Sequence, residues 1–149
     1  MNTKQFGQII ESKFVFECAK LGLTVSQPIG DNAAYDFIID IDGKLVRVQC
    51  KSLRVDIHNE RRFISETNKK QGHRRRDKIS YSGMCDYFFL YNVETEQHAF
   101  INVDDCNQTV SFWSGDKTND TRMRFLSDYD LVDTIEQMRS RAVVSSSVS

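Results

Sequence analysis

Apolar residues recur at helical spacing near the start of the chain. Between residues 4 and 21, six apolar side chains fall along one helical face: Phe6, Ile9, Ile10, Phe14, Cys18 and Leu21. This spacing predicts a helix with Thr3 as its N-cap and Gly22 as the glycine that ends it. A short strand near 23–26 is expected to follow it.

The pattern then changes from helical spacing to the alternation of a β-hairpin. An apolar run at 35–41 is followed by the turn pair Asp42 and Gly43 and by a second run at 44–54. Side chains along the second run alternate in two sets: Arg47, Gln49 and Lys51 on one face, and Val46, Val48 and Cys50 on the other. The pattern predicts two antiparallel strands joined by a tight turn.

This hairpin brings an acid, an amide and an amine to one place. Asp36 lies near the start of the first strand, so the antiparallel return places Gln49 and Lys51 alongside it. Such a set of groups can bind a divalent metal ion and activate water for phosphodiester hydrolysis. Asp40 and Asp42 lie at the far end of the hairpin, where we expect them to form the turn.

The rest of the chain carries further strand patterns and one more helical pattern. We expect strands at 61–66, 87–93, 98–103 and 109–113, loops at 68–76 and 114–121, and a helix at 128–141. The segment 53–56 can pair with 61–66 as a two-stranded ribbon. The Ser-rich end of the chain, 141–149, is expected to be a frayed tail.

Length and composition are those of one globular domain. The chain has 149 residues, of which 40% are hydrophobic and 28% are charged, so we expect a single domain over 1–149. The four cysteines are widely spaced and form no CxxC pair, which argues against a zinc site and a disulfide framework. We see no signal peptide pattern and no run of about 18 apolar residues, so we expect a cytoplasmic protein without a membrane partner.

Positive charge is concentrated in one segment, although the net charge of the chain is only −1. Residues 51–78 contain ten of the twenty Lys and Arg residues against four acids. Lys and Arg hold phosphates, and a two-stranded ribbon fits the major groove of DNA. We therefore interpret nine basic residues as DNA-binding: Arg54, Arg61, Arg62, Lys69, Lys70, Arg74, Arg75, Arg76 and Lys78. The alternative is a charged face that contacts only solvent.

The spacing Asp36-x12-Gln49-x-Lys51 resembles the motif of the PD-(D/E)xK nuclease superfamily, to which many restriction enzymes and Holliday-junction resolvases belong. The sequence departs from the family pattern at Gln49, where Glu or Asp is usual, and Pro28 is too far from Asp36 to form a literal "PD" pair. Small size, the Val-Gln-Cys-Lys form of the motif and the basic segment together most resemble the bacterial group I intron-encoded homing endonucleases of this superfamily.

Two acids on the predicted first helix compete for a role beside this motif. Glu17 falls within the apolar arc of the helix, so burial favours it as the functional acid. The spacing Gly7-x3-Glu11, followed by Gly22, is similar to the opening helix of the resolvase-like branch, whose acid supplies a further metal ligand. We choose Glu11 on this resemblance and expect Glu17 to form a salt bridge.

The resemblance implies an α/β fold with a restriction-endonuclease-like core, in which helices flank a central mixed β-sheet that carries an added basic β-ribbon. It implies Mg²⁺ (or Mn²⁺) bound by Asp36, Gln49, the backbone carbonyl of Cys50 and Glu11. Lys51 would then position or help deprotonate the attacking water.

The implied activity is that of a sequence-specific double-strand DNA endonuclease of the homing type. Cutting both strands requires two sites, which implies a homo-oligomer, either a dimer or a tetramer. Three alternatives remain open at this point: a Holliday-junction resolvase, a restriction or repair nuclease, and a nuclease-fold protein that binds DNA without cutting it.

Overall fold

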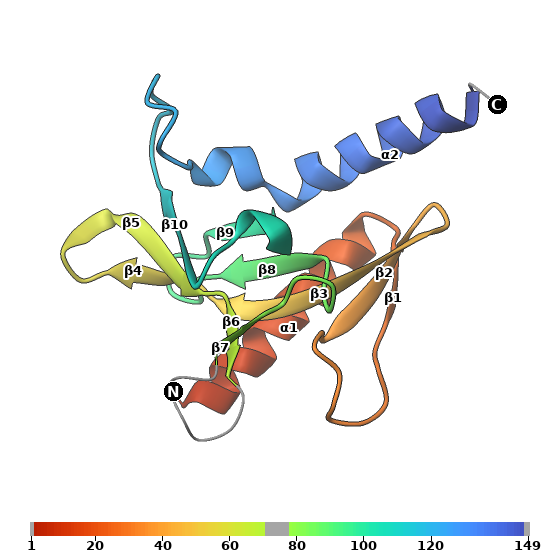
Figure 1. Ribbon diagram of the computed structural model, residues 1–149, viewed down its shortest axis with the longest axis horizontal. Coiled ribbons are helices and arrows are strands. Elements are labelled where there is room, and N and C mark those ends of the chain that lie inside the picture. The colour runs from red at the N-terminus through yellow and green to blue at the C-terminus, as the bar shows by residue number, and fades with distance from the viewer. Residues whose placement is uncertain (1, 71–77, 148–149) are drawn as a thin grey trace.

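The computed structural model describes residues 2–70 and 78–147. In chain order its elements are α1 (Thr3–Lys20), β1 (Thr24–Ser26), β2 (Phe37–Ile41), β3 (Lys44–Ser52), β4 (Arg54–Asp56), β5 (Asn59–Glu66), β6 (Asn68–Lys70), β7 (Lys78–Ser80), β8 (Tyr87–Tyr91), β9 (His98–Asn102), the 3₁₀ helix η1 (Val103–Asp105), β10 (Thr109–Trp113), the 3₁₀ helix η2 (Leu126–Tyr129) and α2 (Leu131–Ser147). These elements form an α/β fold (Figure 1). Within the described ranges, no helix is both long enough and apolar enough to cross a membrane.

The central sheet has five strands in the order β1-β2-β3-β8-β9. Strands β3 and β8 run parallel, with Gln49 opposite Phe88, and the other neighbouring pairs are antiparallel. The mixed sheet predicted for the fold is therefore confirmed. Its middle strand, β3, is the one that carries Gln49 and Lys51.

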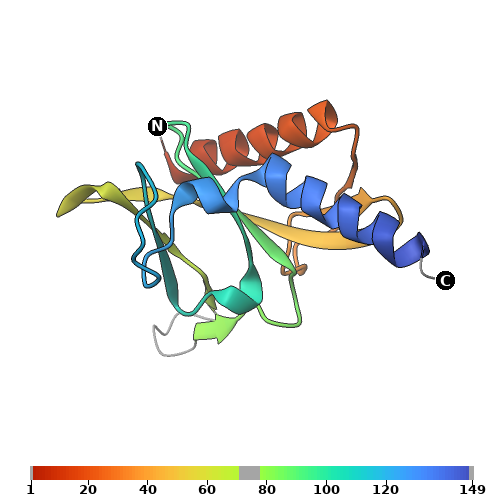
Figure 2. The same ribbon diagram turned by 90° about the horizontal axis from the view of Figure 1, so that it is seen from above.

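Both long helices pack on the same face of the central sheet. The buried residues of α1 and α2 belong to one apolar cluster together with inward side chains of β2, β3, β8 and β9. Phe14 of α1 lies at the centre of this cluster, with its ring centroid 5.5 Å from that of Phe37 and 5.2 Å from that of Phe89. This aromatic packing fixes α1 across the sheet. Figure 2 gives the view from above, with α1 in red and α2 in blue.

The opposite face of the central sheet is covered by a second, three-stranded sheet in the order β10-β5-β4. Strands β4 and β5 pair antiparallel, with Val55 opposite Phe63, and their joined ends extend away from the body of the molecule (Figure 1). This pair is the ribbon that the sequence predicted from 53–56 and 61–66. A separate two-stranded sheet is formed by β6 and β7.

The N-cap of α1 is Asn2, not Thr3 as predicted. The Asn2 side chain accepts a 2.9 Å hydrogen bond from the backbone N–H of Gln5, and the Gln5 side chain accepts one of 2.9 Å from the backbone N–H of Asn2. Such a reciprocal pair needs a polar residue three positions after the cap, and Phe6 cannot fill that role for Thr3. At the other end, Gly22 has the positive φ of 70° that the predicted terminal glycine requires.

Other boundaries also differ from the prediction, several of them by one or two residues at strand ends. Residues 68–70 form strand β6 rather than a loop, because they pair with 78–80. The second helix begins at Leu131 rather than at Asp128, because the Asp130 side chain accepts a hydrogen bond from the backbone N–H of Asp133 and so caps the helix there. The helix continues to Ser147, which lies within the segment 141–149 expected to be a frayed tail.

Candidate active site

The hairpin of β2 and β3 sets the register on which the candidate site depends. Its turn residues, Asp42 and Gly43, have φ of 52° and 94°, and the backbone N–H of Gly43 donates a 2.8 Å hydrogen bond to the Asp40 carboxylate. This is the short turn that two positive φ angles permit, and it confirms that both acids belong to the turn. The resulting register pairs Phe37 with Val48.

Asp36 is held against β3 by two hydrogen bonds. Its backbone N–H donates to the Val48 carbonyl at 2.9 Å, and its Oδ2 accepts from the backbone N–H of Cys50 at 2.8 Å. Burial raises the pKa of Asp36, whereas the Cys50 hydrogen bond and the charge of Lys51 act in the opposite direction. The carboxylate therefore lies beside the segment from Gln49 to Lys51, as the sequence predicted.

Glu11 of α1 approaches this carboxylate from the helical side. It is half-buried, and burial raises its pKa, with the negative charge of Asp36 adding to the shift. A hollow of about 260 Å³ lies between the start of α1 and the end of β3, and its lining includes Glu11, Cys50 and Lys51. Glu11 is thus close enough to Asp36 for the two charges to interact.

Glu17, the competing acid, is engaged within its own helix. Its carboxylate lies 2.9 Å from Lys13 Nζ and 3.3 Å from Lys20 Nζ. Burial pushes the pKa of Glu17 upward, but the hydrogen bonds from the two lysines outweigh burial and lower the pKa overall. The predicted salt bridge of Glu17 is confirmed.

Gln49 and Lys51 lie on the face of β3 away from the helices and are half-buried. Lys51 Nζ lies 5.0 Å from the centroid of the Tyr81 ring. The ammonium is also near enough to Asp36 to lower the pKa of that carboxyl group. The structure therefore brings together Glu11, Asp36 and Lys51, with Gln49 next to them in the strand.

The donor set fits a hard divalent cation. Burial raises the pKa of both carboxyl groups, the charge of Asp36 raises that of Glu11 further, and a bound cation would offset this repulsion. The amide oxygen of Gln49 and the carbonyl of Cys50 add oxygen donors of the kind that Mg²⁺ takes. Among the described residues, no three or more His, Cys, Asp and Glu side chains are grouped to hold a metal.

The predicted DNA-binding residues fall into four groups. Arg54 and Arg61 are exposed on the ribbon of β4 and β5. Arg62 Nη1 instead lies 3.0 Å from Asp56 Oδ2, so it holds the ribbon together. The backbone of Lys69, Lys70 and Lys78 lies in β6 and β7, whereas Arg74, Arg75 and Arg76 lie outside the described residues.

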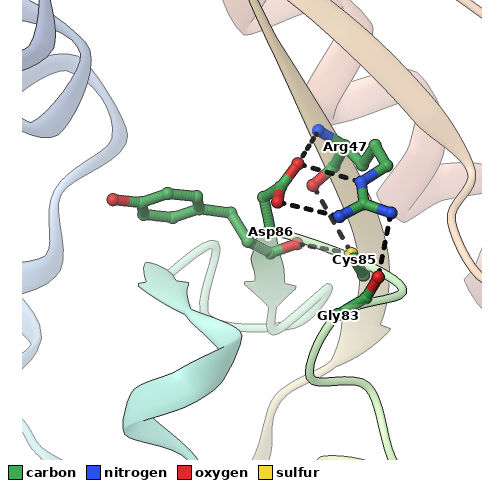
Figure 3. Close-up of polar contacts among 5 residues, drawn as sticks. Arg47, Gly83, Cys85 and Asp86 are labelled. Carbon is green, nitrogen blue, oxygen red and sulfur yellow. Dashed lines mark hydrogen bonds and ion pairs between the residues drawn. The ribbon is translucent and has the colours of Figure 1, made fainter.

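Sequence reasoning missed a clamp between β3 and the turn before β8. The Asp86 carboxylate accepts hydrogen bonds from Arg47 Nε and Nη2, both at 3.1 Å, and from the Arg47 backbone N–H at 2.8 Å (Figure 3). Two of the bonds are parallel and charge-assisted, which is the strongest arrangement available to such a pair. The partners are 39 positions apart, so no local pattern could have identified them.

The same turn contributes Tyr81, a second residue that the sequence did not single out. It is buried, and burial raises its pKa to about 12, with smaller contributions from Cys85 and Asp36. Its ring centroid lies 5.0 Å from Lys51 Nζ, so Tyr81 lies beside the candidate site. Tyr81 could have been identified from the sequence only by predicting the parallel pairing of β3 with β8, which brings this turn beside Lys51.

Comparisons with known proteins identify the family and the fold of the chain. A family model described as PD-(D/E)XK endonuclease matches residues 1–132. Among solved structures, a bacterial homing endonuclease, I-Ssp6803I, has a similar fold, with a TM-score of 0.70 and 21% sequence identity over 99% of this chain and 99% of that chain. No curated protein matches the chain. The extent of the family match, which includes the helix of Glu11 and the hairpin of Asp36 and Lys51, shows that the chain belongs to the PD-(D/E)XK endonuclease family.

Proposed function

We propose that this protein is a Mg²⁺-dependent endonuclease that cuts both strands of DNA at a specific sequence. The observation that carries the proposal is the anchoring of Asp36 to the backbone of β3 between Gln49 and Lys51, within electrostatic range of Glu11. Hydrogen bonds that fix a carboxylate before substrate arrives reduce the reorganisation needed for reaction.

Each residue of the site has a role that follows from its chemistry. Asp36, the Gln49 amide oxygen and the Cys50 carbonyl would bind Mg²⁺, with Glu11 as a further or water-mediated ligand. When bound, the ion supplies Lewis-acid activation of the phosphate and of the attacking water. Lys51 places a positive charge beside the scissile phosphate and orients the water for attack.

The amide at position 49 changes the charge of the site. A glutamate there would give three carboxylates, whereas this chain has two, Glu11 and Asp36, together with the cation Lys51. The lower negative charge weakens the attraction for a divalent cation. We therefore propose that this protein needs a higher Mg²⁺ concentration than an all-carboxylate version of the same site.

The ribbon of β4 and β5 is the proposed DNA-reading element. It extends from the body of the molecule, and Arg54 and Arg61 are exposed on it (Figure 1). A two-stranded ribbon has the width of the major groove, and arginine can contact both phosphates and guanine edges there. Strand β4 follows β3 after a single residue, Leu53, so the ribbon is joined closely to the strand that carries Lys51.

A homing role and a symmetric oligomer complete the proposal. The homing role is supported by the likeness in fold to a bacterial homing endonuclease over nearly the full length of both chains. The described residues of one chain form one candidate site, so cutting two antiparallel strands calls for a pair of chains related by twofold symmetry. A dimer or a tetramer provides that pair.

The test is incubation of the purified protein with randomised linear duplexes and with four-way junctions, in Mg²⁺ and in EDTA. We expect cleavage of both strands in a subset of linear duplexes that share a sequence, and no cleavage in EDTA. Preferential cutting of junctions regardless of sequence would assign the protein as a resolvase instead. Tight duplex binding without cleavage at any Mg²⁺ concentration would contradict the enzymatic proposal.

A further inference from the structure

Tyr81 lies against the ammonium group of Lys51. Lys51 Nζ is 5.0 Å from the ring centroid, within the range at which an aromatic face attracts a cation. Only 6% of the surface of Tyr81 is exposed, so the contact is shielded from bulk water on the side of the ring. The ring in turn packs edge-on against Phe88, with the centroids 5.2 Å apart.

The register of the sheet explains why the ring stands at this place. Phe88 lies opposite Gln49 in the parallel pairing of β3 with β8. Tyr81 packs on Phe88 and also contacts Lys51, two residues beyond Gln49 in the strand. The ring therefore covers the same stretch of β3 that carries the candidate catalytic side chains.

The turn that carries Tyr81 is itself fixed. The backbone N–H groups of Met84 and Cys85 donate to the Tyr81 carbonyl at 2.9 and 3.0 Å. At the end of the turn, Asp86 forms the clamp with Arg47, whose Nη1 also donates to the Gly83 carbonyl at 3.3 Å (Figure 3). These bonds tie the turn to β3 at Arg47 and so hold the Tyr81 backbone beside the strand that carries Lys51.

We propose that Tyr81 is a positioning residue, whose ring holds the Lys51 ammonium at the site where the scissile phosphate binds. The contact is a property of the fold, whereas its effect on cleavage rests on the nuclease function proposed above. An aromatic face suits this task because it orients a cation without cancelling its charge. A carboxylate in the same place would neutralise the ammonium that the phosphate needs.

The contact itself is tested by NMR on protein labelled with ¹³C at the Lys ε carbons. The Lys51 signal is assigned by its loss in Lys51→Arg. A cation above an aromatic ring experiences the ring current, so we expect the Lys51 ε protons to lie upfield of the ordinary lysine position. They should stay upfield in Tyr81→Phe and move to the ordinary lysine position in Tyr81→Leu. An unshifted Lys51 signal in the wild-type protein would by itself overturn the proposal.

The effect on reaction is tested by single-turnover cleavage beside DNA affinity. Tyr81→Leu should slow cleavage about tenfold, the scale of a partly buried cation–π contact, with DNA affinity unchanged. Tyr81→Phe keeps the ring and should retain the wild-type rate. Tyr91→Leu is the matched control, because Tyr91 is also buried but packs in the cluster on the helical face.

The outcomes separate positioning from packing. Equal losses of cleavage in Tyr81→Leu and Tyr91→Leu would indicate general destabilisation and overturn the proposal, as would full activity in Tyr81→Leu. If the wild-type protein cuts no DNA, the proposed function fails, while the NMR measurement still decides whether Tyr81 holds Lys51.

Discussion

The backbone N–H of Cys50 donates a 2.8 Å hydrogen bond to Oδ2 of Asp36. This bond joins the acid that precedes β2 to the strand that carries Gln49 and Lys51. Gln49 and Lys51 of the candidate site therefore lie on a paired strand, and Asp36 is hydrogen-bonded to that strand from the position directly before β2. Sites placed on strands hold their side chains more precisely than sites on loops do.

Replacing Gln49 with Glu should strengthen Mg²⁺ binding. The variant adds a carboxylate beside Asp36, so half-maximal cleavage is expected at a lower Mg²⁺ concentration, with cleavage retained at least in part. The measurement is a Mg²⁺ titration of cleavage rate. Gln137→Glu is the control, since it adds the same charge at an exposed position on α2. Identical titrations for Gln49→Glu and wild type would show that residue 49 is not a ligand.

Glu11 and Glu17 lie on one helix and allow a paired test of the helical acid. Glu11→Gln removes a proposed ligand, and we expect a fall in cleavage of about 10- to 100-fold, as for a residue that supports a metal site. Glu17→Gln should cut at the wild-type rate and lose about 0.5 kcal/mol of stability, because it breaks a half-buried ion pair at i,i+4 spacing. Reduced cleavage by Glu17→Gln together with wild-type cleavage by Glu11→Gln would assign the helical acid of the site to Glu17.

The ribbon arginines should control the salt dependence of DNA binding. Arg54→Ala and Arg61→Ala should each lower the magnitude of the slope of log affinity against log salt by about 0.9, if each contacts one phosphate. Arg62→Ala is the control, because Arg62 is paired with Asp56. Binding measured over a salt series gives the slopes. Unchanged slopes in both of the first two variants would assign these residues to a solvent-exposed face.

His98 should make the protein less stable in mild acid. Its Nε2 accepts a 3.0 Å hydrogen bond from the backbone N–H of Leu131 at the start of α2. Burial lowers the pKa of His98 below its ordinary value of 6.5, although Asp130 opposes the shift. The folded state therefore binds fewer protons than the unfolded state, and stability is lost as pH falls from about 6.5 through the folded pKa.

The measurement for His98 is the thermal midpoint of wild type and His98→Gln from about pH 8 to about pH 5. Gln keeps an acceptor for Leu131 but does not titrate, so the wild-type midpoint should fall further than that of the variant. Other groups titrate in both proteins and cancel in the comparison. Parallel curves would indicate that His98 is not linked to folding.

Local patterns in the sequence predicted the hairpin and the position of Asp36 within it. The pair Asp42-Gly43 specifies the turn, and the alternation along β3 then places Gln49 and Lys51 on one face. The contacts of Tyr81 with Lys51 and of Arg47 with Asp86 were not predictable in this way. They depend on the parallel pairing of β3 with β8, which only the complete fold specifies.

The sequence also did not predict which face of the sheet the helices cover, or which basic residues form internal ion pairs. Periodicity identified both helices, but only packing against Phe37 and Phe89 determines that they share one face of the sheet. The charge pattern did not distinguish among the ribbon arginines. In the structure, Arg62 is paired with Asp56, whereas Arg54 is exposed. Charge patterns locate a basic segment without saying which of its members form internal pairs.

The most direct test of the site compares cleavage and binding of the selected DNA sequence by Asp36→Asn, Lys51→Ala and the control Asp40→Asn. Asp40 lies on the same hairpin, and Asn keeps the acceptor that its turn requires. We predict that Asp36→Asn and Lys51→Ala bind the DNA but do not cut it, whereas Asp40→Asn cuts at the wild-type rate. Wild-type cleavage by either Asp36→Asn or Lys51→Ala would contradict the assignment of this site.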